Sequence, residues 1–286
     1  MEKEITQEIE YVRLVGDERR RGDTLKKVSR HWQEEKECYA LVSPHDDDVI
    51  LGAGLFMQLA QREGIPTHVI IVTDGSMGYC SEEEKETISE TRKKETYDCY
   101  QSLGIPRENI HWLGFPDSGL NAYRGRRLAL PTDRGQIAGY TGLQNAFTFV
   151  MRKICPTQCF VPTFNDLHPD HKITYEELLI SLFHAGGAIW PELGSPIEKT
   201  PYVHEMAIYC DFPEPPTLRI STPDAFLDKK LEAICAFKSQ KQITSLIEGV
   251  RASGPYEYMR SLNFHLYQPQ KYYDTFEKEH YIPFVR

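Results

Sequence analysis

The chain has 286 residues, of which 40% are hydrophobic and 26% are charged, a composition typical of a folded globular protein. Its 33 basic and 42 acidic residues give a net charge of −9, which argues against a general nucleic-acid binder. No apolar stretch reaches the roughly 18 residues that a membrane-spanning helix needs, and we expect no secretory signal. Seven scattered cysteines favour reduced thiols and predict a cytoplasmic protein.

In chain order, apolar runs of strand length alternate with helical patterns. Residues 1–36 are rich in charge and predict a peripheral N-terminal extension, ahead of a single domain over 37–286. Unbroken apolar runs predict strands at 38–43, 67–75, 109–117, 159–164 and 202–210. Amphipathic segments predict helices at 49–64, 82–104, 143–154, 169–186 and 225–240.

This alternation of strands and helices predicts an α/β fold. Strands joined by helices pack as parallel neighbours with helices on both faces, so we expect a Rossmann-like three-layer fold with a mostly parallel sheet. Open parallel sheets bind their ligands outside the carboxyl ends of the strands. We therefore expect the active site at the ends of these strands.

Two of the predicted strand ends carry side chains suited to a metal ion. His45, Asp46, Asp47 and Asp48 follow the first strand, and the run NDLHPDH at 165–171 follows the fourth. Adjacent carboxylates repel one another and are costly to bury unless a positive charge offsets them. Two imidazoles and a carboxylate with an open position are typical of hydrolytic zinc. Each run alone also fits a solvated turn, but together they favour a divalent cation.

These two runs, SPHDDDVILGAG and LHPDH, resemble the signature motifs of the LmbE-like/PIG-L family of metal-dependent deacetylases. Weaker matches occur in the family's order at VTDG, RKKE, SLG and GFPDSGL, and the likeness runs from about residue 38 to 175. The late segments AFKSQ and YEYMR resemble the family's C-terminal motifs. The chain departs from the pattern at Asp46, where proline is usual, and at Val49, where glutamate is commoner.

The resemblance implies a metal centre and a catalytic base. His45, Asp48 and His171 fall on the family's zinc ligands, and Asp47 falls on its base. Zinc, or iron or another divalent metal in its place, would lower the pKa of bound water toward neutrality. Asp47 would take the proton as the water attacks an acetamide carbonyl, and would then protonate the leaving amine.

The resemblance also implies residues that stabilise the transition state and bind the substrate. His168 matches the histidine that steadies the oxyanion, with Asp170 beside it as an orienting carboxylate. Arg92 and Asp117 match positions near the sugar hydroxyls. From the residues alone, Arg92 with Glu95 also fits a surface ion pair, and Asp117 before Ser-Gly also fits a turn.

A long connection rich in glycine and arginine follows the third predicted strand. Connections longer than about 12–15 residues are usually functional or disordered. We expect residues 118–142 to form a rim or lid in which Tyr123, Arg124, Arg126 and Arg127 contact an anionic aglycone. A solvated loop is the alternative.

Together these features predict a zinc-dependent deacetylase that removes the N-acetyl group from a small GlcNAc-type sugar or conjugate. Two alternatives stay open, namely a metal-dependent hydrolase of another amide and a carbohydrate- or partner-binding protein without turnover. No G-x-G-x-x-G motif follows the first strand, which argues against a nucleotide-binding enzyme. The aromatic segment NFHLYQPQKYYDTFEKEHYIPF either wraps the domain or forms a contact between copies of the chain.

Overall fold

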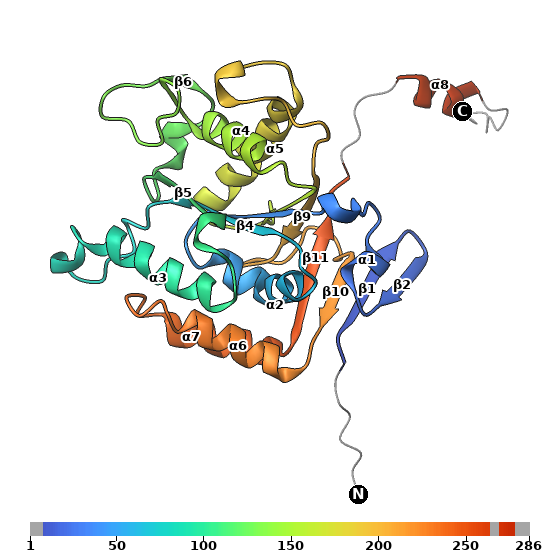
Figure 1. Ribbon diagram of the computed structural model, residues 1–286, viewed down its shortest axis with the longest axis horizontal. Coiled ribbons are helices and arrows are strands. Elements are labelled where there is room, and N and C mark those ends of the chain that lie inside the picture. Colours follow the sequence, from blue (N-terminus) through green and yellow to red (C-terminus); the bar gives the residue numbers. More distant parts are fainter. Residues whose placement is uncertain (1–7, 264–268, 278–286) are drawn as a thin grey trace, which may run out of the picture.

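The computed structural model, which describes residues 8–263 and 269–277, is an α/β fold built on one large mixed sheet (Figure 1). One half of the sheet contains β3 (Tyr39–Ser43), β4 (Thr67–Thr73), β5 (Ile110–Phe115), β8 (Gln158–Pro162) and β9 (Tyr202–Met206). The other half contains β1 (Glu10–Val15), β2 (Glu18–Gly22), β10 (Leu218–Ser221) and β11 (Tyr256–Ser261). The order is β2-β1-β10-β11-β9-β8-β3-β4-β5, and β6 (Arg127–Leu128) pairs separately with β7 (Tyr140–Thr141).

The strand direction changes at β9. The pairs β9–β8, β8–β3, β3–β4 and β4–β5 are parallel. The pairs β9–β11, β11–β10, β10–β1 and β1–β2 are antiparallel. The prediction of a mostly parallel sheet is therefore wrong for the sheet as a whole. The antiparallel half escapes the sequence pattern because β10 has only 4 residues, and because β2 (ERRRG) is a charged strand with no buried residue.

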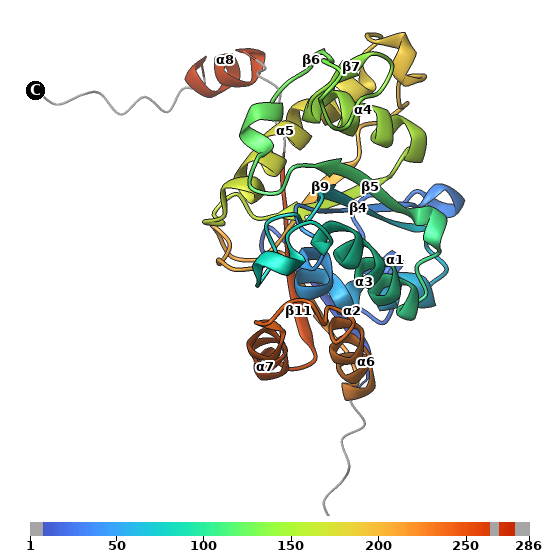
Figure 2. The same ribbon diagram turned by 90° about the vertical axis from the view of Figure 1, so that its left-hand side faces the viewer.

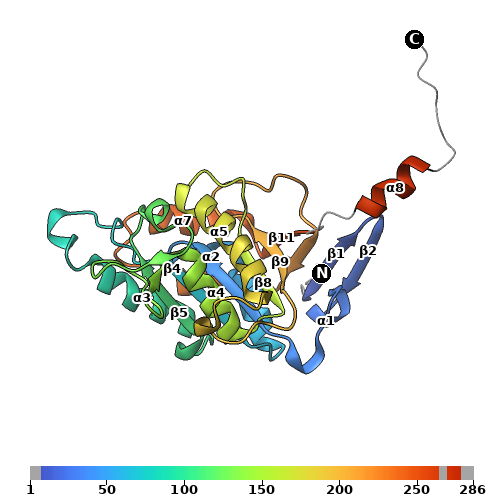
Figure 3. The same ribbon diagram turned by 90° about the horizontal axis from the view of Figure 1, so that it is seen from above.

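The N-terminal segment joins the sheet at one edge. β1 pairs with β10 and β2, and Figure 3 shows this hairpin at the opposite end of the sheet from β5. Tyr11 of β1, together with Leu25 and Val28 of α1 (Leu25–Val28), is buried in the main core. The boundary between an extension over 1–36 and a domain over 37–286 stays a prediction, and residues 1–7 lie outside the described part.

Helices cover both faces of the parallel half of the sheet (Figure 2). On one face lie α2 (Asp48–Arg62), α3 (Ile88–Ser102), α6 (Asp224–Ile234) and α7 (Ile243–Ser253), and on the other lie α4 (Leu143–Ile154) and α5 (Pro169–Gly186). Neighbouring side chains of a strand point to opposite faces, so Phe160 and Val161 of β8 enter two different apolar cores. Among the described helices, none has the length and apolar character needed to span a bilayer.

The C-terminal helix α8 (Pro269–Glu277) lies apart from this body (Figure 1). Its Tyr273 and Phe276 side chains are exposed. The prediction for the aromatic C-terminal segment falls partly on residues 264–268 and 278–286, which lie outside the described residues.

Helix α2 contains a break. Side chains from distant parts of the chain form hydrogen bonds with the backbone groups at this break. Ala53 has non-helical angles, with φ −142° and ψ 22°, so the backbone groups around it lose their usual helical partners. Lys230 donates through Nζ to the carbonyl oxygen of Leu51 at 2.6 Å and to Glu257 Oε1 at 2.8 Å. The Glu257 carboxylate in turn accepts the backbone N–H groups of residues 55 and 56, each at 2.8 Å. We call this arrangement the α2 break.

Candidate active site

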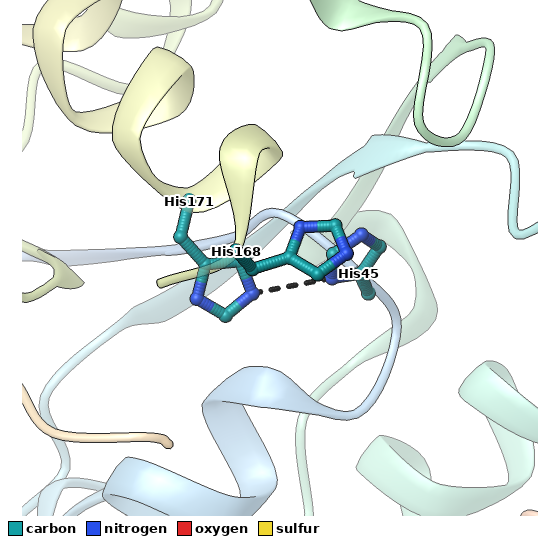
Figure 4. Close-up of side chains that lie close together, drawn as sticks. All are labelled: His45, His168 and His171. Atoms are coloured by element: carbon teal, nitrogen blue, oxygen red, sulfur yellow. Dashed lines mark hydrogen bonds between the residues drawn. The ribbon is translucent and has the colours of Figure 1, made fainter. Parts of the chain in front are cut away.

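The loops after β3 and β8 bring three histidines together at the carboxyl ends of parallel strands (Figure 4). His45 lies just before α2, whereas His168 and His171 lie at the start of α5. One ring nitrogen from each of the three lies within 4.8 Å of those of the other two. Two motifs that are 126 residues apart in the chain therefore meet at one point.

Asp48 completes a triangle of potential metal ligands with two of these histidines. His45 Nδ1 lies 3.2 Å from His171 Nε2 and 3.3 Å from Asp48 Oδ2. His171 Nε2 lies 3.1 Å from Asp48 Oδ2. Ligand atoms held at about 2.0 Å from a tetrahedral zinc ion are roughly 3.3 Å apart. The three atoms therefore fit one divalent metal ion with a coordination position left open.

Carboxylates lie next to the second ring nitrogens of both His45 and His171. Asp166 Oδ2 lies 3.1 Å from His171 Nδ1. Asp117 Oδ1 and Asp170 Oδ2 lie 3.4 Å and 3.5 Å from His45 Nε2. Such partners fix the tautomer and orientation of a metal-binding imidazole. Sequence reasoning missed Asp166, although it lies within the same NDLHPDH run.

The expected relation between Asp170 and His168 takes a different form in the structure. The Asp170 carboxylate faces His45 and accepts the backbone N–H of Ser118 at 2.8 Å. The contact with His168 comes from the Asp170 backbone N–H, which donates to His168 Nδ1 at 3.2 Å. Because Nδ1 accepts this bond, a neutral His168 carries its proton on Nε2.

Asp47 lies at the N-terminus of α2 and lines the cavity beside the triangle. Its side chain is buried, and Oδ2 has no hydrogen-bond partner among the described residues. The cavity has a volume of about 200 Å³ and is also lined by Arg92, Asp117 and His168. A buried polar atom without a partner costs about 1–3 kcal/mol, so this oxygen is placed for a ligand or for water.

The charges of Asp48, His45 and His171 stabilise one another, and carboxylates outside the triangle add to this effect. Burial lowers the pKa of His45, but the charge of Asp48 and hydrogen bonds to neighbouring carboxylates outweigh it and raise this pKa well above its usual value. Burial also lowers the pKa of His171, but the charge of Asp48 and the contact with Asp166 outweigh it and raise this pKa to about 9. Burial would raise the pKa of Asp48, yet the two histidines hold it far below normal. A divalent cation can take the place of the two imidazole protons.

The neighbouring titratable groups are dominated by burial. Burial and the charge of Asp47 raise the pKa of Asp46 to about 7, against the opposing charge of Arg92. Burial and Asp48 raise the pKa of Asp47. Burial, followed by the charges of the other two histidines, lowers the pKa of His168. A bound divalent cation would favour the ionised form of each carboxyl group nearby.

Arg92 is buried and directed at the cavity, not at Glu95. Its Nη1 lies 3.5 Å from Asp46 Oδ2 and 3.1 Å from Gln240 Oε1. Glu95 instead accepts the backbone N–H and hydroxyl of Ser239, at 2.9 Å and 2.7 Å. The surface ion pair considered from the sequence is therefore wrong. Gln240, which lines the cavity, belongs to the AFKSQ segment but was not assigned a role from the sequence.

The arginines of the 118–142 loop do not line this cavity. Arg124 lies 2.6 Å from Glu176 and 3.4 Å from Glu177 of α5. Arg127 pairs with Asp133 within the loop at 2.6 Å. The predicted rim residue Tyr123 packs against Phe115, with ring centroids 5.2 Å apart. A substrate role for Tyr123 and Arg124 stays a prediction without a contact to the cavity.

Arg126 is held between aromatic rings. Its guanidinium lies 3.5 Å from the ring centroid of Tyr140 and 4.6 Å from that of Trp190. It also donates to Asn145 and pairs with Glu192. These contacts tie the loop to the body of the fold.

Sequence comparison places the two motifs within a known family. Residues 40–181 match the model of the PIG-L family, described as GlcNAc-PI de-N-acetylase. A curated relative, the probable N-acetyl-alpha-D-glucosaminyl L-malate deacetylase 2 of Bacillus cereus, is 24% identical over 212 residues. The match covers 71% of this chain and 83% of the relative.

Solved structures share the fold. The N,N'-diacetylchitobiose deacetylase of Pyrococcus horikoshii has a TM-score of 0.63 and 20% identity, covering 82% of this chain and 86% of that one. The 4-carboxy-2-hydroxymuconate hydratase GalB of Pseudomonas putida has a TM-score of 0.61 and 16% identity, covering 81% and 98%. At these identities the likeness shows the fold alone, and the two neighbours carry different reactions in their names.

Proposed function

Because residues 40–181 carry a domain of the PIG-L (LmbE-like) deacetylase family, we propose that this protein is a metal-dependent hydrolase that removes the acetyl group from an N-acetylglucosamine-type sugar or conjugate. The observation that carries the proposal is the triangle of His45, Asp48 and His171 beside the unpartnered Asp47 oxygen. The relative of Bacillus cereus and the Pyrococcus deacetylase support an N-acetylated sugar as the substrate.

His45, Asp48 and His171 would hold the metal ion, with zinc as the first choice and iron or another divalent metal as the alternative. When bound, such an ion supplies Lewis acidity for the acetamide carbonyl and lowers the pKa of water toward neutrality. Asp166 and Asp170 would keep the two ligand imidazoles oriented through their second nitrogens.

Asp47 is the proposed general base and acid. Its unpartnered Oδ2 would take a proton from the attacking water and later give it to the leaving amine, so that acetate and a free amino sugar are released. His168, whose Nδ1 is occupied by the Asp170 N–H, would donate from Nε2 to the carbonyl oxygen as negative charge develops there. Arg92 and Asp117 line the cavity and are the proposed contacts for sugar hydroxyls.

Three further parts of the proposal concern the whole protein. We assign a Rossmann-like three-layer arrangement to the parallel half of the sheet, within a single domain over 37–286. The free cysteines support a cytoplasmic location. We propose that the C-terminal aromatic segment forms the contact if copies of the chain associate.

The proposal is tested by metal content and product analysis on protein purified without chelators. We expect about one equivalent of metal in the wild type, little in His171→Ala, and release of acetate with a free amine from N,N'-diacetylchitobiose by the wild type alone. Bound metal without acetate release from any N-acetyl sugar would point to another amide or to a hydratase. Metal-free wild type that still binds sugars would favour a binding protein.

A further inference from the structure

Acidic side chains outnumber basic lysine and arginine side chains in the lining of the cavity beside the triangle. Asp46, Asp47 and Asp117 contribute carboxylates to its wall. Arg92 is the single arginine or lysine among the described residues that line it. Asp48 and Asp170 add negative charge directly behind the wall, so the carboxylates outnumber the charges of Arg92 and one divalent cation.

The charge of Arg92 is already balanced within the chain. Its Nη1 contacts both Asp46 Oδ2 and Gln240 Oε1, and the Arg92 and Asp46 side chains are only 7% and 5% exposed. Asp46 stands where the family's pattern has proline, which carries no charge. In this chain the single arginine of the wall therefore faces a carboxylate before any substrate enters.

The arginines expected to receive an anionic aglycone are engaged elsewhere. Arg124, Arg126 and Arg127 all lie in the 118–142 loop, and each forms an ion pair with a carboxylate of this chain. None of the three lines the cavity. Met77 and Tyr209, which line the cavity and are 54% and 51% exposed, present uncharged side chains to it instead.

From this charge balance we infer that the site accepts neutral N-acetyl sugar conjugates and discriminates against anionic ones, with Asp46 as the residue that sets the preference. The inference rests on the proposed function and names its substrate class. Bringing a phosphate or carboxylate group against uncompensated carboxylates costs free energy in both substrate binding and the transition state. The Asp46 carboxylate weakens the attraction of Arg92 for an anionic group, because it already pairs with that guanidinium.

The test compares two glycosides of the same anomeric configuration, methyl N-acetyl-α-glucosaminide and N-acetyl-α-glucosamine 1-phosphate. Acetate release is measured for the wild type, Asp46→Asn and the control Asp228→Asn, which removes an exposed carboxylate of α6. We expect kcat/KM of the wild type to be at least about tenfold higher for the methyl glycoside. Asp46→Asn should narrow this ratio at least about threefold, whereas Asp228→Asn should leave it unchanged.

Each outcome bears on a different claim. Equal kcat/KM for the two glycosides in the wild type, or a preference for the phosphate, overturns the inference while leaving deacetylation intact. If folded Asp46→Asn has the same ratio of kcat/KM values for the two glycosides as the wild type, Asp46 does not determine the preference for neutral substrates. No acetate from either glycoside or from N,N'-diacetylchitobiose refutes the proposed function itself. If Asp46→Asn does not fold, the ionic-strength dependence of the wild-type ratio decides, because salt should raise kcat/KM for the phosphate only.

Discussion

Replacing Lys230 by methionine removes the cation that closes the α2 break while keeping an unbranched side chain of similar length. Lys230 and Glu257 have side chains that are each only 4% exposed, so water does not replace the lost contact. The substitution leaves the Leu51 carbonyl without its donor at 2.6 Å and the Glu257 carboxylate without its counter-ion at 2.8 Å.

The magnitude follows from what remains around Glu257. Removing one partner of a buried ion pair costs about 3–5 kcal/mol. Two backbone N–H groups, those of residues 55 and 56, still donate to the carboxylate, so we expect the lower end, about 3 kcal/mol. For a protein of this size such a loss lowers Tm by about 5–10 °C.

Urea unfolding followed by circular dichroism measures the effect, with Lys229→Met as the matched control on the exposed side of α6. The control should change the free energy of unfolding by no more than about 0.5 kcal/mol. The double variant Lys230→Met/Glu257→Gln should lose at least about 1 kcal/mol less than the sum of the single variants, because the two groups interact directly. If Lys230→Met is as stable as Lys229→Met, the pair does not hold the α2 break.

Further predictions concern the site and the acid sensitivity of the fold. Asp47→Asn should lower kcat about 10²- to 10⁴-fold at unchanged metal content, measured by acetate release and elemental analysis; loss of metal would contradict its role as base. Asp166→Ala should weaken metal affinity about 10- to 100-fold in a chelator competition, because it frees the second nitrogen of His171; equal affinity would argue against that role. Burial lowers the pKa of His204 to about 3, so stability should fall as pH drops below the ordinary histidine pKa. Because the unfolded chain alone takes up this proton, the loss from His204 is about 2 kcal/mol between about pH 6.5 and 4.5, and urea unfolding of His204→Gln should show a loss smaller by that amount.

The parts of the fold that the sequence predicted are those with strong local patterns. β3, β4 and β8 are buried along their whole length or nearly so, and the apolar runs in their sequences predict these strands. β2 is a charged strand at the edge of the sheet. It forms because it pairs with β1, and its own sequence has no apolar pattern that predicts a strand. The α2 break could not be predicted from the local sequence either. The segment LGAG is compatible with a continuous helix, and the break is stabilised by Lys230 and Glu257, which belong to other elements.

In the candidate active site, too, the residues within the two motifs could be predicted, whereas contacts with residues far apart in the sequence could not. The two motifs indicated that His45 and His171 would approach each other, since both follow strands of one parallel sheet. The residues that then surround them were less predictable. Arg124 was expected at the substrate, but acidic side chains of α5 lie closer to it, and only the packing of the loop against that helix reveals this. Gln240 reaches the cavity from a segment beyond α6.

The α2 break also has a consequence for the order in which the protein matures. Asp48 begins the helix whose interruption is closed by Glu257, a residue 202 positions after Leu55. A ribosome-bound chain that already contains all three proposed ligand residues, up to His171, therefore still lacks the Glu257 carboxylate that caps the second half of that helix. Metal loading during biosynthesis is thus expected to wait for β11, and nascent chains shorter than about residue 257 should retain metal poorly even though both signature motifs have emerged.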